Sequence, residues 1–185
     1  LEITSNGSTM EMKRISFVKL LGGGIFIFFQ PWSALEILSL PAEQARSLTK
    51  DYNAFLQIAE DGTVSCFTGK IEMGQGIITS LAQEMAEELN VPFEKVKMIM
   101  GDTDLCPYDA GTWGSMTTRG FGPNMRVAAA EARAVLLDLA SIQLGVPVTQ
   151  LEVNDGVITD TKNPQNKVTY AALAKGKKLE KYLDV

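Results

Sequence analysis

The middle of the chain alternates between hydrophobic and polar positions in the way that a β-hairpin requires. Residues 54–59 and 63–68 both alternate, and Glu60-Asp61-Gly62 between them has the composition of a turn. From residue 77 onward, hydrophobic side chains instead recur every four positions. This change of period predicts an amphipathic helix over 77–90, which Pro92 ends.

The second half of the chain repeats this change of period. Alternation over 95–100 predicts a third strand, and the run 123–144, which opens with a proline and is followed by a glycine, predicts a second helix. Residues 151–158 have the pattern of a hairpin around Asp155-Gly156, and 168–179 that of a short strand and helix. We therefore predict an α+β domain built from a β-hairpin, helix, strand, helix and hairpin.

The first fifty residues have a different character. An apolar run of about ten residues, 20–29, follows the cations Lys13, Arg14 and Lys19. Such a run is short for a helix that crosses a bilayer, and it fits the hydrophobic region of a signal peptide. A buried core helix is the less favoured alternative, because each of the glycines at 22–24 costs roughly 1 kcal/mol relative to alanine in a helix.

Residues 14–19 resemble the twin-arginine export motif, although Ile15 occupies the position of the second arginine. We interpret 1–50 as an export leader and linker, and 51–185 as the folded domain. The protein is expected to be exported, and to be either periplasmic or membrane-anchored on the periplasmic side. Removal of the leader and its retention as an anchor both remain open.

Composition excludes several classes of function. The net charge of −5 gives no electrostatic footprint for nucleic acid. The absence of histidine excludes Ser-His-Asp and Cys-His catalysis within the chain. Cys66 and Cys106 are the two cysteines, too few for an iron–sulfur cluster or a tetrahedral zinc site. Any metal must therefore be held by something other than protein side chains.

The loop 69–76 joins the predicted hairpin directly to the first helix. Unpaired backbone N–H groups at a helix start suit an anion, and Gly74 and Gly76 allow the backbone to approach a ligand closely. Gln75 between them has an uncharged amide that both donates and accepts hydrogen bonds. The spacing matches neither a dinucleotide fingerprint nor a P-loop. A tight strand-to-helix turn is therefore the alternative interpretation.

The second loop, 101–122, has about twenty residues without regular periodicity, and loops of this length are often functional. Asp102 and Asp104 could be a metal or acid/base pair, but surface turn residues are the favoured interpretation. Cys106 has no histidine to activate it and is expected to be a packed thiol. The loop also contains three hydroxyls that could bind phosphate, those of Ser115, Thr117 and Thr118.

The ordered series of these motifs is more specific than any one of them. The loop 69–76, a helix, Gly101-Asp102-Thr103-Asp104 and then Gly111-Thr112-Trp113-Gly114-Ser115 before a second helix is similar to the xanthine oxidase/aldehyde oxidase family of molybdenum hydroxylases. In particular, it resembles the large (beta) subunit of isoquinoline 1-oxidoreductase-type enzymes. The resemblance covers roughly residues 50–170 and the leader. It implies the amino-terminal part of a molybdopterin-binding aldehyde oxidase-type domain.

The resemblance also implies a cofactor, molybdopterin cytosine dinucleotide, whose dithiolene holds the molybdenum without a direct protein ligand. Gln75 would then hydrogen-bond an oxo ligand of the metal, while Gly74 and Gly76 allow the cofactor to approach. The second loop would line the pterin and its phosphates through Gly111, Thr112, Gly114, Ser115 and Thr117. Relatives usually have an arginine after the serine. Here Met116 stands in that place, and Arg119 follows three positions later.

The implied enzyme is an oxidoreductase that hydroxylates aldehydes or N-heterocycles, its small-molecule substrates, with oxygen from water. Electrons would leave through a separate small [2Fe–2S] subunit to an acceptor such as a cytochrome. The glutamate that acts as base in the family lies far toward the carboxyl terminus. We therefore assign no catalytic residue within this chain, and Glu72 is not assigned that role. The chain is not expected to turn over alone. The alternative is a non-catalytic exported domain that binds small molecules or partners.

Overall fold

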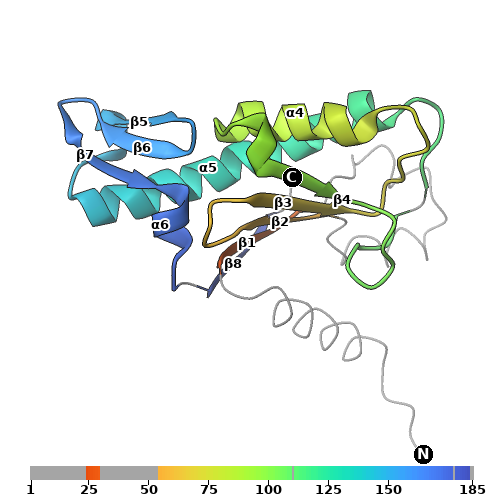
Figure 1. The fold of residues 1–185 in the computed structure, drawn as a ribbon, viewed down its shortest axis with the longest axis horizontal. Coiled ribbons are helices and arrows are strands. Elements are labelled where there is room, and N and C mark those ends of the chain that lie inside the picture. The colour runs from red at the N-terminus through yellow and green to blue at the C-terminus, as the bar shows by residue number, and fades with distance from the viewer. Residues whose placement is uncertain (1–23, 30–53, 110, 177, 184–185) are drawn as a thin grey trace, which may run out of the picture.

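The described part of the chain is residues 24–29, 54–109, 111–176 and 178–183 of a computed structural model. It contains two β-sheets, two long helices and several short helical segments (Figure 1). The larger sheet has five strands in the order β4-β3-β2-β1-β8, which are β4 (Val96–Ile99), β3 (Val64–Thr68), β2 (Ala54–Ile58), β1 (Gly24–Phe29) and β8 (Lys178–Leu183). The smaller sheet contains β5 (Leu151–Asn154), β6 (Val157–Asp160) and β7 (Asn163–Thr169). The α+β prediction is confirmed.

The predicted hairpin forms the centre of the large sheet. Strands β2 and β3 pair antiparallel, with Leu56 opposite Cys66, and both of these side chains are buried. Strand β4 then pairs parallel to β3, because the intervening helix returns the chain to the end of the sheet at which β3 begins. The loop 69–76 therefore lies where the end of β3 meets that helix.

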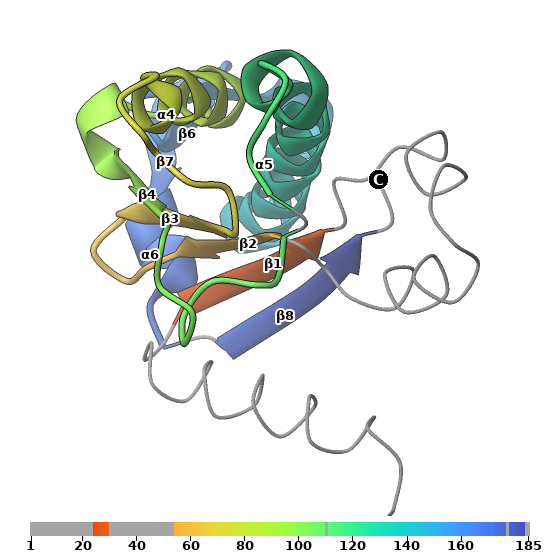
Figure 2. The ribbon, with the colours of Figure 1, turned by 90° about the vertical axis from the view of Figure 1, so that its right-hand side faces the viewer.

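Helices α4 (Ile77–Leu89) and α5 (Gly122–Leu144) lie side by side on one face of the large sheet (Figure 2). Both predicted helices are confirmed, and their ends agree with the predictions to within one residue. The buried face of α4 repeats at the predicted four-residue spacing. The buried face of α5 is rich in alanine, which permits close packing, and includes Ala128, Ala129, Ala132 and Ala140.

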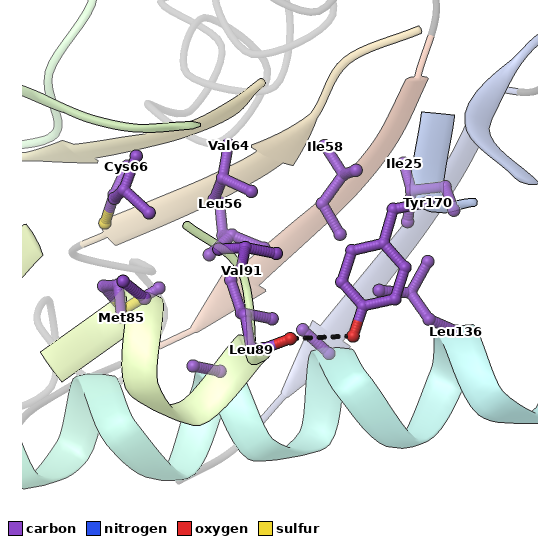
Figure 3. Packing of buried hydrophobic residues seen from close by; sticks show 14 of the residues in the cluster. Ile25, Leu56, Ile58, Val64, Cys66, Met85, Leu89, Val91, Leu136 and Tyr170 are labelled. Atoms are coloured by element: carbon purple, nitrogen blue, oxygen red, sulfur yellow. Dashed lines mark hydrogen bonds between the residues drawn. The ribbon is translucent and has the colours of Figure 1, made fainter. Parts of the chain in front are cut away.

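Tyr170, at the start of the short helix α6 (Tyr170–Ala174), connects the smaller sheet to the core. Its ring is 2% exposed, and its hydroxyl donates a 2.8 Å hydrogen bond to the carbonyl oxygen of Leu89 (Figure 3). Next to it, the backbone N–H of Gly156 donates to the carbonyl of Asn90. The predicted hairpin around Asp155-Gly156 is thus held against the C-terminal end of α4.

Strand β1 differs from the sequence-based expectation, which placed no strand before residue 54. Its six residues come from the apolar run 20–29 and pair antiparallel with β2 and parallel with β8. Isoleucine and phenylalanine favour strands, and Ile25 and Phe26 are almost fully buried. Residues 1–23 and 30–53, the rest of the predicted leader and linker, lie outside the described residues.

A second difference lies in the long loop. Residues Thr117–Phe121 form one π-helical turn that runs directly into α5, so the irregular stretch ends at Met116 rather than at Gly122. Among the described residues, no helix has the length and hydrophobicity needed to cross a membrane.

Candidate functional site

The two loops singled out in the sequence meet in space. The backbone N–H of Ile71 donates a 2.9 Å hydrogen bond to Oγ1 of Thr112, across 41 residues of sequence. Next to this contact, Nζ of Lys70 donates to the carbonyl oxygen of Gly111 at 2.9 Å and to Oδ1 of Asp109 at 3.0 Å. The segment after β3 and the segment before α5 are therefore joined at three points.

A pocket of about 490 Å³ lies between these loops. It is lined by Met73, Gln75, Ile77, Thr112, Trp113, Gly114, Ser115, Thr117 and Thr118. Five of the eight predicted cofactor-binding residues are therefore gathered around one pocket. Gly74, Gly76 and Gly111 are not among its lining residues.

The glycines of the first loop adopt backbone conformations that other residues rarely adopt. The φ angles of Gly74 and Gly76 are +93° and +84°, and a Cβ atom on either would meet nothing within 4 Å. Their backbone therefore faces open space, as close approach by a ligand requires. Gly111 differs, because a Cβ atom there would lie 2.5 Å from the ring of Trp113. This glycine makes room for the indole.

Gln75 bridges its own loop with both ends of its amide. Its Oε1 accepts from the N–H of Met73 at 2.5 Å, and its Nε2 donates to the carbonyl of Ile71 at 2.8 Å. A primary amide has two N–H groups, so these bonds leave one further donor on an exposed side chain that lines the pocket. The loop thus fixes the position of a neutral hydrogen-bond donor.

The carboxylate of Glu72 corrects the expectation that the start of α4 is an open anion site. Its Oε1 accepts from the N–H groups of Gly74 and Gly76, at 2.7 and 3.0 Å. Its Oε2 accepts from Ile78 at 3.0 Å. These hydrogen bonds, of which that from Ile78 contributes most, lower the pKa of Glu72 below its ordinary value. The chain therefore supplies its own anion at this helix terminus.

The second loop turns tightly beside the pocket. Gly114 and Ser115 both have positive φ angles, of 62° and 54°, and the N–H of Met116 donates to the carbonyl of Trp113 across the turn. Beyond it, Thr118 Oγ1 lies 3.0 Å from Ser80 Oγ on α4, which joins the π-helical turn to the first helix. The hydroxyl of Thr118 is thus held close to the first turn of α4.

The remaining polar candidates of the second loop have structural roles. Asp102 Oδ1 accepts from the N–H groups of Asp104 and Leu105, as expected for a turn residue. The thiol of Cys106 donates to the carbonyl of Ile99, and burial raises its pKa, so the packed-thiol prediction is confirmed. Arg119 donates to the sulfur of Met116 and does not line the pocket. Within the described ranges, no cluster of three or more histidine, cysteine, aspartate or glutamate side chains could hold a metal.

Sequence reasoning missed the apolar part of the pocket and the cation beside it. Trp113 and Met73 are 63% and 68% exposed although they line the pocket, and Lys70 was not singled out at all. The sequence contains a signal for Trp113, since a large aromatic residue close to Gly111 and Gly114 in a long loop is not expected to pack in a core. Lys70 gave no such signal, because its partners lie 39 and 41 residues away.

Comparison with known proteins gives one family over nearly the whole chain. A family model described as a molybdopterin cofactor-binding domain matches residues 8–183. A nicotinate dehydrogenase subunit of Pseudomonas putida is 37% identical over 123 residues, which cover 66% of this chain and 10% of that protein. The beta subunit of isoquinoline 1-oxidoreductase from Brevundimonas diminuta is 33% identical over 128 residues, which cover 65% of this chain and 16% of that protein. The chain thus spans a small part of the length of these relatives.

Solved structures agree with this result. The CO dehydrogenase of Oligotropha carboxidovorans superimposes with a TM-score of 0.58 at 32% identity, over 65% of this chain and 15% of that chain. The quinoline 2-oxidoreductase of Pseudomonas putida gives a TM-score of 0.56 at 28% identity over the same shares.

Proposed function

This chain belongs to the molybdopterin cofactor-binding domains of the xanthine oxidase family, and from that premise we propose that its two-loop pocket holds the pterin of a molybdenum cofactor in the cytosine dinucleotide form. The contact between Ile71 and Thr112 is the observation that carries the proposal, because it brings two distant loops together around one pocket. The pocket volume is within the range of small-molecule and cofactor sites.

The chemistry of the pocket lining fits such a group. No acidic side chain is among the lining residues, so the lining itself places no negative charge against a cofactor that carries phosphates. Four hydroxyls and one amide offer hydrogen bonds, and Met73, Ile77 and Trp113 offer apolar surface to a planar ring. The open space above Gly74 and Gly76 allows the ring to approach the backbone.

The residues of the chain would bind and orient the cofactor. When bound, the molybdenum cofactor supplies the redox chemistry that hydroxylates a carbon with oxygen from water. Gln75 would donate its remaining amide N–H to the metal centre without adding charge to it. Thr112, Ser115 and Thr117 would donate to the pterin and its phosphates. Glu72 would hold the backbone around Gln75 in place.

Metal and pterin analysis tests this proposal. The complete protein, expressed in a host with an intact molybdenum-cofactor pathway, should contain about one molybdenum and one pterin per chain, and mild acid should release cytidine monophosphate. Purified protein without molybdenum or pterin would overturn the proposal and favour a non-catalytic binding domain.

We propose that the complete protein is the large subunit of an oxidoreductase for aldehydes or N-heterocycles. Its relatives include proteins named as subunits, which supports a partner subunit here. The separate partner would carry the [2Fe–2S] clusters and pass electrons to an acceptor such as a cytochrome. Within residues 1–185, two cysteines are too few to hold a cluster. Co-purification of a small subunit with the electron paramagnetic resonance signal of a [2Fe–2S] cluster is expected.

Export is part of the same proposal, on the strength of Lys13, Arg14 and Lys19 before the apolar run. Because Gly24–Phe29 pairs with β2 and β8, a mature chain that keeps these residues preserves the sheet. Cell fractionation and amino-terminal sequencing of the mature protein test both points. Protein found entirely in the cytoplasm would contradict export.

A further inference from the structure

Lys70 occupies the junction of the two loops and is largely removed from solvent. Its side chain is 15% exposed, and that of its ion-pair partner Asp109 is 1% exposed. The ammonium donates to Asp109 Oδ1 and to the Gly111 carbonyl. Its nitrogen lies 5.4 Å from the centre of the Phe121 ring and 6.0 Å from that of Trp113, within cation–π range. One cation therefore contacts four residues of the second loop and the π-helical turn.

These contacts lie next to the hydrogen bond that joins the two pocket-forming loops. Together they hold the loops to each other, and we call this set of contacts the clamp. Lys70 directly precedes Ile71, whose N–H bonds Thr112, and Gly111 directly precedes Thr112. Asp109 Oδ1 also accepts from the N–H of Gly111, at 2.8 Å. The ion pair therefore fixes the backbone on both sides of the contact between the loops.

Loss of Lys70 is expected to destabilise the junction of the two loops strongly. The second carboxylate oxygen of Asp109 is buried and has no hydrogen-bond partner among the described residues. Without Lys70, this buried carboxylate would keep only the N–H of Gly111. A buried charge that loses its partner is strongly destabilising. Asp109 is bonded to Gly111, next to Thr112 in the pocket lining, so the loss acts directly on the segment that forms this wall.

We propose that Lys70 is a positioning residue for the cofactor pocket: through Asp109 and Gly111 it holds the wall formed by Thr112 and Trp113 against the Gln75 loop. This role rests on the proposed function, since a cofactor must occupy the pocket. Lys70 itself does not line the pocket. Its influence on the cofactor is therefore indirect.

Hydrogen exchange measured by mass spectrometry on the complete protein tests the clamp directly. In Lys70→Met, backbone amides in 69–76 and 111–118 should exchange on the order of tenfold faster or more, because a partly buried ion pair and its hydrogen bonds are lost. Amides in 151–160, on the smaller sheet, should be unchanged. Lys97→Met, an exposed lysine on β4, serves as the matched control.

The same variants are assayed for pterin and molybdenum content. Lys70→Met should retain less of both than Lys97→Met, while its fold remains intact in 151–160. Unchanged exchange in the two loops, or a uniform increase that includes 151–160, would overturn the clamp. Faster loop exchange with full pterin content would overturn the positioning role. Absence of pterin from the wild type as well would refute the proposed function, while the exchange result still decides the clamp.

A second variant covers the possibility that Lys70→Met does not fold. Asp109→Asn keeps the size of the side chain and one acceptor oxygen but removes the charge, so the same two segments should exchange faster by a smaller factor. No change in either loop of this variant would also overturn the clamp.

Discussion

The backbone N–H of Ile71 donates a 2.9 Å hydrogen bond to the hydroxyl of Thr112, and this is one of the three contacts that join the two loops. In the sequence, Ile71 follows Lys70, which bonds the second loop, and precedes Glu72, which accepts hydrogen bonds from the start of α4. Thr112 lies beside Gly111, whose lack of a side chain leaves room for the Trp113 ring. The contact therefore couples the position of the indole to the start of α4.

Thr112→Val should loosen this coupling, because valine has nearly the same shape but cannot accept the hydrogen bond. We expect a loss of about 1 kcal/mol in the free energy of unfolding, together with a lower pterin content. Urea unfolding and pterin analysis measure the two effects. Thr149→Val, at an exposed position before β5, is the control and should change neither. Full stability and full pterin content in Thr112→Val would contradict the assigned role.

Gln75→Ala should affect the proposed metal site more than the fold. The substitution removes the bonds to Met73 and Ile71, both within an exposed loop, so the effect on stability should be small. Loss of a group that supports a metal centre typically reduces metal affinity or activity by about 10- to 100-fold. Molybdenum content and turnover of the complete enzyme measure this effect.

Gln83→Ala provides the comparison, since Gln83 is exposed on α4 and does not line the pocket. It should retain full molybdenum content and turnover. If Gln75→Ala matched it in both respects, Gln75 would have no part in the cofactor site.

The elements that the sequence predicted correctly are those set by local pattern. Helix α4 follows from apolar side chains at four-residue spacing, and the turn at Asp155-Gly156 from its residue types. The pairing of β1 with β8 could not be predicted, because parallel partners are distant in sequence and their register depends on the whole sheet. The apolar run that forms β1 fits a signal peptide and a buried strand equally well by composition.

The residues of the candidate site also fall into two groups, those that the sequence motifs indicated and those that only the structure brings together. The ordered motifs located Gln75, Thr112, Gly114, Ser115 and Thr117 at one pocket. Lys70 and Asp109 became visible only in three dimensions, since an ion pair across 39 residues leaves no periodic signal. Glu72 stands five residues before the start of α4, outside the usual N-cap position, so its hydrogen bonds to Gly76 and Ile78 also became visible only in the structure.

Tyr170→Phe tests how the smaller sheet is held to the core. The substitution removes the hydroxyl that donates to Leu89 and leaves that carbonyl without this partner in a buried environment. The free energy of unfolding should fall by about 1–2 kcal/mol. Tyr108→Phe, at a side chain that is 72% exposed, should change it by less than about 0.5 kcal/mol. Equal stabilities of the two variants in chemical denaturation would refute the linking role of Tyr170.

Glu72→Gln tests the internal anion at the start of α4 through its pH dependence. Hydrogen bonds from Ile78, Gly76 and Gly74 lower the pKa of Glu72 in the folded chain from its ordinary value of 4.5. Since the folded pKa is the lower one, the ionised carboxylate stabilises the fold fully above the ordinary value. This stabilisation is lost as the pH falls through the lowered one.

The melting temperature of the wild type should therefore exceed that of Glu72→Gln at about pH 7, and the difference should shrink as the pH falls below 4.5 and through the lowered pKa of Glu72. Salt should also reduce the difference, because the interaction of a carboxylate with a helix terminus is screened. Glu152→Gln, an exposed position on β5, controls for the loss of one negative charge. A difference between wild type and Glu72→Gln that stayed constant over this pH range would mean that the charge of Glu72 does not cap α4. The shape of its side chain would then be what orders the loop around Gln75.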